Sequence, residues 1–124
     1  MPSSILVVDD STLVRTQLRR ALSGVGFDVT EAVDGEDAWE RLSGGFRPDL
    51  VFCDINMPRM NGLELLERLQ QAGLTPGLRV VVLTTEGQVE MIQRAKALGA
   101  KAWILKPFKA ELIIAAAERL ANAA

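Results

Sequence analysis

Histidine is missing from all 124 residues. Its absence excludes a Ser-His-Asp triad, a histidine-ligated metal and a phosphohistidine on this chain. No Gly-x-x-x-x-Gly-Lys-Ser/Thr sequence is present either, so there is no P-loop with which to hold a nucleotide. Any catalysis must therefore use carboxylates, hydroxyls, lysine and a bound ion.

Cysteine occurs once, as Cys53, which excludes an internal disulfide and favours a reducing compartment. Because Cys53 lies within an apolar run, we expect a small core residue. No apolar run approaches the roughly 18 residues of a membrane helix, and residues 1–4 show no start of a signal peptide. We therefore expect a cytoplasmic protein without membrane insertion. The net charge of −2 argues against direct nucleic-acid binding, which requires a basic patch.

What the chain does contain is a regular alternation of strand and helix patterns. With 48% apolar residues it can form a full core, and we expect residues 1–124 to be one domain without an output domain. Short apolar runs predict strands, which we place at 5–8, 27–32, 50–53, 79–83 and 101–105. Helical spacing of apolar residues predicts helices, which we place at about 14–22, 38–42, 63–69, 89–98 and 108–120.

This order predicts an α/β fold, a doubly wound parallel sheet with right-handed crossovers and helices on both faces. The runs 50–53 and 79–83 do not alternate, as expected of central strands buried on both faces, whereas 27–32 alternates like an edge strand. In the first helix, Ser11 or Asp10 is the expected N-cap, and Arg15, Arg19 and Arg20 are expected to face solvent.

A carboxylate closes the central run 50–53. Two explanations fit Asp54: it caps the turn that follows, as Asp often does, or it is a working carboxylate at the end of a buried strand. The other strands favour the second explanation, because three more apolar runs also end in polar residues. These residues are Asp9-Asp10, Thr84 and Lys106. In a parallel sheet these ends share one edge, where ligands of open α/β sheets bind.

The chemistry of these side chains is complementary. Asp9, Asp10 and Asp54 repel one another unless a cation lies among them, and hard oxygen ligands suit Mg²⁺. Lys106 adds a positive charge and Thr84 a hydroxyl, which together predict a phosphoryl-transfer site. In such a site Asp54 can act as the nucleophile and become an aspartyl phosphate.

These motifs resemble the receiver domain of two-component response regulators over essentially the whole chain. The matching residues are Asp9-Asp10, Asp54 with Asn56-Met57-Pro58 and Gly62, Thr84, and Lys106-Pro107-Phe108. The resemblance implies a flavodoxin-like five-stranded sheet of order 2-1-3-4-5 and a cis Lys106–Pro107 bond. That strand order is the known order of the chemotaxis member of this family, and the resemblance alone supplies it.

The resemblance also implies roles for the site residues. Asp54 would be the phosphoacceptor, and Thr84 and Lys106 would contact the phosphoryl oxygens. Mg²⁺ would be held by Asp10, Asp54 and the backbone carbonyl of Asn56, with Asp9 acting mainly through water. The expected phosphodonor is a sensor histidine kinase or its phosphotransfer domain.

Finer features are similar to the single-domain chemotaxis (CheY-like) regulators. They are Thr84-Thr85-Glu86, residues 99–108 and Asn56. Trp103 stands where these relatives usually carry a Tyr switch residue, and a simple core role for Trp103 stays open. We expect a monomer or weak dimer.

The expected output is docking of an effector on the face formed by the fourth helix, fifth strand and fifth helix. That last helix is apolar around much of its circumference, so either it is an Ala-rich surface helix or Ile113 or Ile114 belongs to the docking face. Two other functions stay open: a phosphorelay intermediate or phosphate sink without its own effector, and a degenerate receiver that serves as an interaction module.

Overall fold

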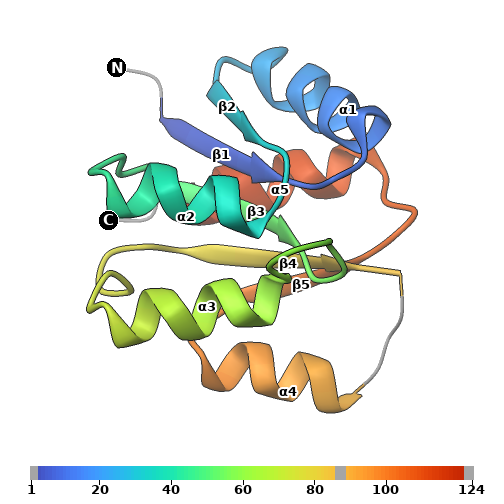
Figure 1. Ribbon diagram of the computed structural model, residues 1–124. Helices are drawn as coiled ribbons and strands as arrows, with labels where there is room; N and C mark the ends of the chain where they lie inside the picture. Colours follow the sequence, from blue (N-terminus) through green and yellow to red (C-terminus); the bar gives the residue numbers. More distant parts are fainter. Residues whose placement is uncertain (1–2, 86–88, 122–124) are drawn as a thin grey trace.

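The computed structural model describes residues 3–85 and 89–121, where strands and helices alternate along the chain (Figure 1). The strands are β1 (Ser4–Val8), β2 (Asp28–Ala32), β3 (Leu50–Asp54), β4 (Val80–Thr84) and β5 (Ala102–Leu105). The helices are α1 (Thr12–Ser23), α2 (Gly35–Ser43), α3 (Gly62–Gln71), α4 (Val89–Ala97) and α5 (Ala110–Ala121).

All strand pairs are parallel, and the order is β2-β1-β3-β4-β5, which confirms the predicted α/β fold. Every residue of β3 and β4 is buried, whereas the edge strand β2 keeps partly exposed positions, as its alternation predicted. From β1 the chain goes to β2 on one side and later to β3 on the other. The strand order therefore reverses beside β1 and β3, where α/β sheets of this type bind ligands.

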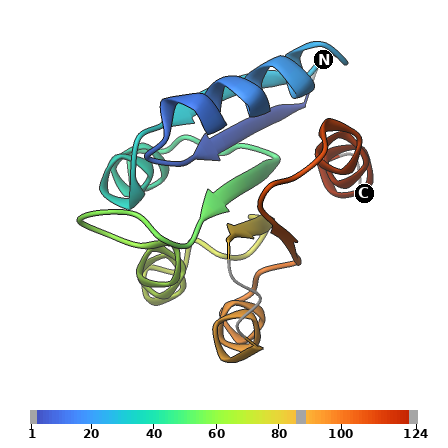
Figure 2. The ribbon, with the colours of Figure 1, turned by 90° about the vertical axis from the view of Figure 1, so that its right-hand side faces the viewer.

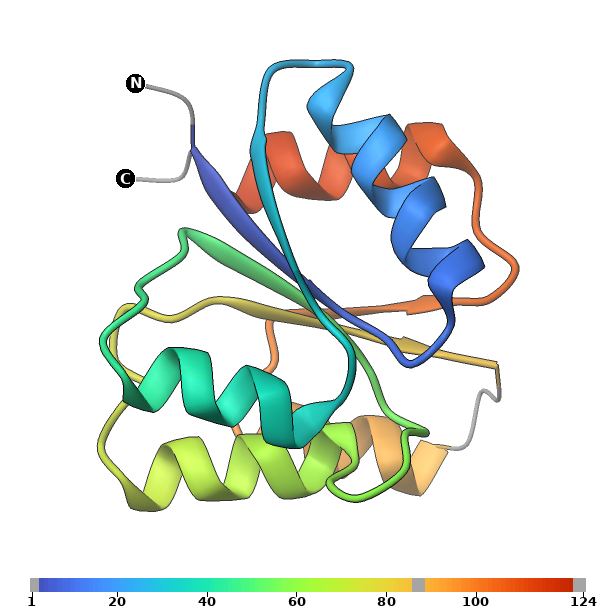
Figure 3. The same ribbon diagram turned by 45° about the horizontal axis from the view of Figure 1, so that its top comes forward.

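Helices cover both faces of the sheet, with α1 and α5 on one side and α2, α3 and α4 on the other (Figure 3). The side view shows the same three layers (Figure 2). Each face has its own apolar cluster, because alternate strand residues point to opposite faces. In β4, for example, Val82 packs with the α2–α4 cluster and Val81 with the α1–α5 cluster.

Local capping explains where the helices begin. The Ser11 hydroxyl accepts a hydrogen bond from the Val14 N–H, so Ser11 is the N-cap of α1. Asn61 and Glu64 form a reciprocal capping box at the start of α3, which satisfies two backbone N–H groups. These caps fix the first turns of the helices that follow β1 and β3.

One exposure prediction was wrong, and one of two alternatives for the last helix is excluded. Arg15 is buried, at 9% exposure, because it lies three residues before Leu18 and seven before Leu22 on the buried stripe of α1. Ile113 is fully buried against the sheet and cannot belong to a docking face, whereas Ile114 is half-buried.

Within residues 3–85 and 89–121, no helix combines the length and the hydropathy needed to cross a bilayer.

Candidate phosphoryl-transfer site

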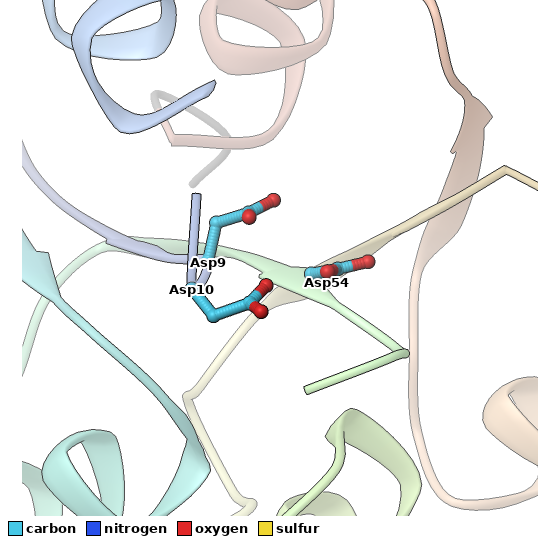
Figure 4. A group of neighbouring side chains, drawn as sticks. All are labelled: Asp9, Asp10 and Asp54. Carbon is cyan, nitrogen blue, oxygen red and sulfur yellow. The ribbon is translucent and has the colours of Figure 1, made fainter. Parts of the chain in front are cut away.

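Three carboxylates meet at the carboxyl edge of the sheet. Asp9 and Asp10 directly follow β1, and Asp54 ends the neighbouring strand β3. One oxygen of each lies within 4.8 Å of the other two, and Figure 4 shows the three side chains gathered at this place. Asp9 and Asp54 are buried, while Asp10 is exposed. The sequence-predicted acidic residues are therefore brought together, and one of them faces solvent.

Lys106 supplies the positive charge beside this cluster. It follows β5, and its Nζ lies 2.6 Å from Asp9 Oδ2 and 3.4 Å from Asp54 Oδ1. The Lys106–Pro107 bond is cis, as the resemblance implied. The other Asp9 carboxylate oxygen, Oδ1, accepts a 2.9 Å hydrogen bond from the Ser11 N–H. Asp9 is thus held on both oxygens, and Lys106 also pairs with Asp54 at a longer distance.

The site disfavours the charge on Asp54. Burial is the main reason that the pKa of Asp54 rises to about 6, and the nearby charge of Asp9 raises it further. Lys106 and a backbone hydrogen bond from Asn56 act in the opposite direction but do not compensate fully. Burial also raises the pKa of the adjacent Cys53 thiol, so Cys53 is an inert core residue, as predicted.

The remaining predicted residues differ in their exposure to solvent. Thr84 is the last residue of β4 and is buried at 1% exposure. Asn56 is exposed, two residues beyond Asp54. Trp103 lies in β5 and is 40% exposed, with the Lys96 Nζ 4.1 Å from its ring centroid. Glu86 lies outside the described residues.

The loop from 55 to 61 is pressed against its neighbours. The Gly62 N–H donates to the Ile55 carbonyl, and a Cβ added at Gly62 would lie 2.5 Å from the Asp54 carbonyl oxygen. Arg59, in the left-handed region with φ of 66°, forms a two-pronged pair with the buried Asp34 at 2.7 and 3.0 Å. This pair ties the loop that contains Asn56 to the N-cap of α2.

Sequence reasoning missed Arg15 and the Arg59–Asp34 pair. The helical spacing of Arg15 with Leu18 and Leu22 was a signal for its burial. No pattern in the sequence indicated Arg59, because its partner Asp34 lies 25 residues away. Of the two arginines, Arg15 contacts the acidic cluster directly, through the backbone carbonyl of Asp9.

The donor set fits a hard divalent cation. Carboxylate oxygens are preferred by Mg²⁺, and the three acidic groups carry more negative charge than Lys106 offsets. The raised pKa of Asp54 is the sign of this uncompensated charge and of burial. A cation-assisted reaction at Asp54 is therefore chemically reasonable at this edge.

The chain is similar to known proteins over most of its length. The profile of the response regulator receiver domain matches residues 5–118. The chain belongs to the receiver domain family of response regulators. Members of this family bind Mg²⁺ at an acidic pocket, accept a phosphoryl group and work with histidine kinases and downstream effectors.

Individual relatives differ in length. Over 106 residues the receiver is 46% identical to the "Regulator of RpoS" of Escherichia coli K12. The aligned region covers 85% of this chain but only 30% of that protein. The chemotaxis protein CheY of Thermotoga maritima is 31% identical, with 98% and 100% of the two chains covered. The solved CheY4 of Vibrio cholerae superposes with a TM-score of 0.88 at 32% identity, covering 97% and 99%. This receiver is therefore CheY-like in sequence and fold.

Proposed function

We propose that this receiver accepts a phosphoryl group onto Asp54 from a histidine kinase or its phosphotransfer domain. The observation that carries the proposal is the placement of Asp54, a buried carboxylate at the end of β3 with Lys106 3.4 Å away and two further carboxylates beside it. No other cluster of three metal-ligating side chains occurs among the described residues.

The carboxylates of Asp9, Asp10 and Asp54 and the backbone carbonyl of Asn56 would hold Mg²⁺. The bound ion would neutralise the acidic cluster and the charge that develops on the transferring phosphoryl group. Asp9 is already engaged by Lys106 and Ser11, which favours a contribution through water. Residues 1–124 would form one receiver domain.

In the proposed reaction an Asp54 oxygen attacks the phosphorus of a phosphohistidine on the partner. The new P–O bond forms as the P–N bond breaks, and the electron pair stays on the imidazole nitrogen. Lys106 and the Thr84 hydroxyl contact the phosphoryl oxygens and stabilise their charge. Attack of water on the same phosphorus later releases inorganic phosphate and restores the Asp54 carboxylate.

Output would pass to an effector that docks on the α4-β5-α5 face, in control of chemotaxis or motility. The names of CheY and CheY4, which match this chain over nearly their whole length, support this assignment. A second candidate follows from the higher identity to the Regulator of RpoS, namely a receiver that acts in a regulatory process other than chemotaxis. A phosphate sink without an effector is a third, and a partner captured only by the phosphorylated form would exclude it.

Incubation with acetyl phosphate and Mg²⁺ tests the nucleophile. We expect the mass of one phosphoryl group to be added, through a bond that is stable in acid and labile in base. Asp54→Asn should abolish the addition and keep the fold, because the two side chains have nearly the same shape. Asp49→Asn is the matched control, since Asp49 is an exposed carboxylate just before the same strand. Phosphorylation of Asp54→Asn at the wild-type rate would refute the assignment.

A further inference from the structure

A buried arginine lies directly behind the acidic cluster. Arg15 is the fourth residue after the Ser11 N-cap of α1, and helical side chains point back toward the helix N-terminus. Its guanidinium therefore reaches the end of β1. A cation here opposes the positive end of the helix dipole, so its position has to be stabilised by specific partners.

Three hydrogen bonds provide those partners. Arg15 Nη1 donates to the backbone carbonyl of Asp9 at 2.6 Å, in a buried position. Nε donates to Glu31 Oε1 at 3.1 Å, and Nη2 donates to the Thr12 hydroxyl at 3.2 Å. The planar guanidinium is thus fixed by groups from the β1 end, β2 and α1.

The Asp9 carbonyl belongs to the peptide unit that joins Asp9 to Asp10. That unit is planar, so a fixed carbonyl also fixes the Asp10 N–H and the Cα of Asp10. The other side of Asp9 is held by its own N–H, which donates to the Ala32 carbonyl at 3.2 Å. Arg15 consequently determines where the chain places Asp10.

Asp10 depends on this support. Its carboxylate is exposed, and no hydrogen bond or ion pair to it is found within residues 3–85 and 89–121. Asp9 differs, because Lys106 and the Ser11 N–H hold its carboxylate directly. For Asp10, the Asp9–Asp10 backbone therefore fixes the position from which its side chain extends toward Asp54.

We propose that Arg15 is a positioning residue for the divalent-cation site, acting through the Asp9–Asp10 peptide, with Glu31 as the residue that orients Arg15. This inference rests on the proposed function of the pocket as a cation site. Charge alone has the opposite effect, because a nearby guanidinium repels a divalent cation. The two roles of Arg15 can thus be separated by experiment.

Arg15→Lys separates them, since it keeps the charge and loses the fork that holds the carbonyl and Glu31 together. The probe is Mn²⁺, which suits the same oxygen ligands, with free ion counted by electron paramagnetic resonance and Mg²⁺ as competitor. We expect Arg15→Lys to bind Mn²⁺ about tenfold more weakly, as for other groups that orient metal ligands. A role through charge alone predicts unchanged affinity.

Arg19→Lys is the matched control, because Arg19 pairs with the other oxygen of Glu31 at 2.7 Å, is exposed and makes no contact with Asp9. Its affinity should equal that of wild type. Circular dichroism checks that each variant is folded. Should Arg15→Lys not fold, Glu31→Gln takes its place and should weaken Mn²⁺ binding in the same direction.

The outcomes distinguish this inference from the function on which it rests. Wild-type affinity in folded Arg15→Lys, or in Glu31→Gln when that variant replaces it, overturns the positioning role while leaving the cation site intact. Equal weakening in Arg19→Lys also overturns it, since the effect would then belong to the Glu31 pairs in general. Absence of Mn²⁺ binding by wild type overturns the proposed cation site together with this inference.

Discussion

Asp54, the proposed phosphoacceptor, is poorly solvated in the folded protein. At 5% exposure it lies next to the Asp9 carboxylate, and only part of its charge is compensated by Lys106. The folded protein therefore favours the neutral acid, with a pKa of about 6 against 3.8 for an ordinary Asp. Ionised Asp54 at neutral pH is a strained state of the metal-free protein that a bound cation would relieve.

The sign of the resulting pH effect follows from proton binding. Between about pH 4 and pH 6 the folded state holds a proton on Asp54 that the unfolded state has released, so stability falls as pH rises through this window. The difference between the two pKa values corresponds to roughly 3 kcal/mol. In EDTA at pH 7 we expect Asp54→Asn to raise the free energy of unfolding by about 1–3 kcal/mol.

Urea unfolding of wild type and Asp54→Asn at several pH values measures this effect. The advantage of Asp54→Asn should shrink as pH falls from about 6 and approach zero only below the unfolded pKa of 3.8, where Asp54 is neutral in both states. The comparison of two variants cancels other carboxyls, such as Asp34, whose pKa is lowered chiefly by its hydrogen bond to Arg59. An advantage that stayed constant from pH 4 to pH 7 would contradict the raised pKa of Asp54.

At the scale of elements, the start of α3 and the end of β3 are in van der Waals contact. Gly62 begins α3, and its missing side chain leaves room for the carbonyl of Asp54. Gly35 at the start of α2 plays the same part, because a Cβ there would lie 2.2 Å from the Met60 carbonyl oxygen. The two glycines let two helices close around the loop between Asp54 and Asn61.

Gly62→Ala tests this packing. Helix propensity alone predicts that Ala is more stable by about 0.5–1 kcal/mol. The added Cβ, however, would lie 2.5 Å from backbone that cannot rotate away, so we expect a net loss of about 1–3 kcal/mol. Phosphorylation by acetyl phosphate should also slow, because the end of β3 has to move.

Gly24→Ala is the control for the substitution itself. Gly24 caps α1 in a right-handed helical conformation, and Ala72 already occupies the same position and conformation after α3. Chemical unfolding of both variants gives the comparison. Equal stability of Gly62→Ala and wild type would show that the Asp54 backbone is free to move.

At the scale of the whole molecule, β4 and β5 connect the acidic edge of the sheet to the face that carries Trp103 and α4. Thr84 pairs in register with Leu105, so Thr84 and Trp103 project to the same face of the sheet. Trp103 lies under the Lys96 side chain of α4. A shift of Thr84 toward a phosphoryl group would free space on this face, and Trp103 could then repack with α4.

Thr84→Ala should therefore uncouple the site from Trp103. In a Trp39→Phe background, where Trp103 is the only tryptophan, we expect beryllofluoride with Mg²⁺ to change wild-type fluorescence and Thr84→Ala to lose most of that change. Acetyl phosphate should still phosphorylate Thr84→Ala. Thr85→Ala, an exposed neighbour, is the control. A full fluorescence response in Thr84→Ala would exclude this route.

Sequence alone determined the fold class and the membership of the acidic cluster. Apolar periodicity is a local property, so alternating strand and helix patterns sufficed to predict a parallel sheet with its strand ends at one edge. That edge placed Asp9, Asp10, Asp54 and Lys106 together, and the structure has them so. Periodicity left the strand order open, and the motif resemblance supplied it.

Tertiary structure decided which partners these residues have. Lys106 lies closer to Asp9 than to Asp54, although the three residues come from three separate segments of the chain. Arg15 is buried where it bonds to Asp9, just after β1, and to Glu31 in β2, and Ile113 is buried by contacts with the sheet. Such pairings depend on distances between segments far apart in sequence, and a distance of that kind exists only once the sheet and its helices have packed.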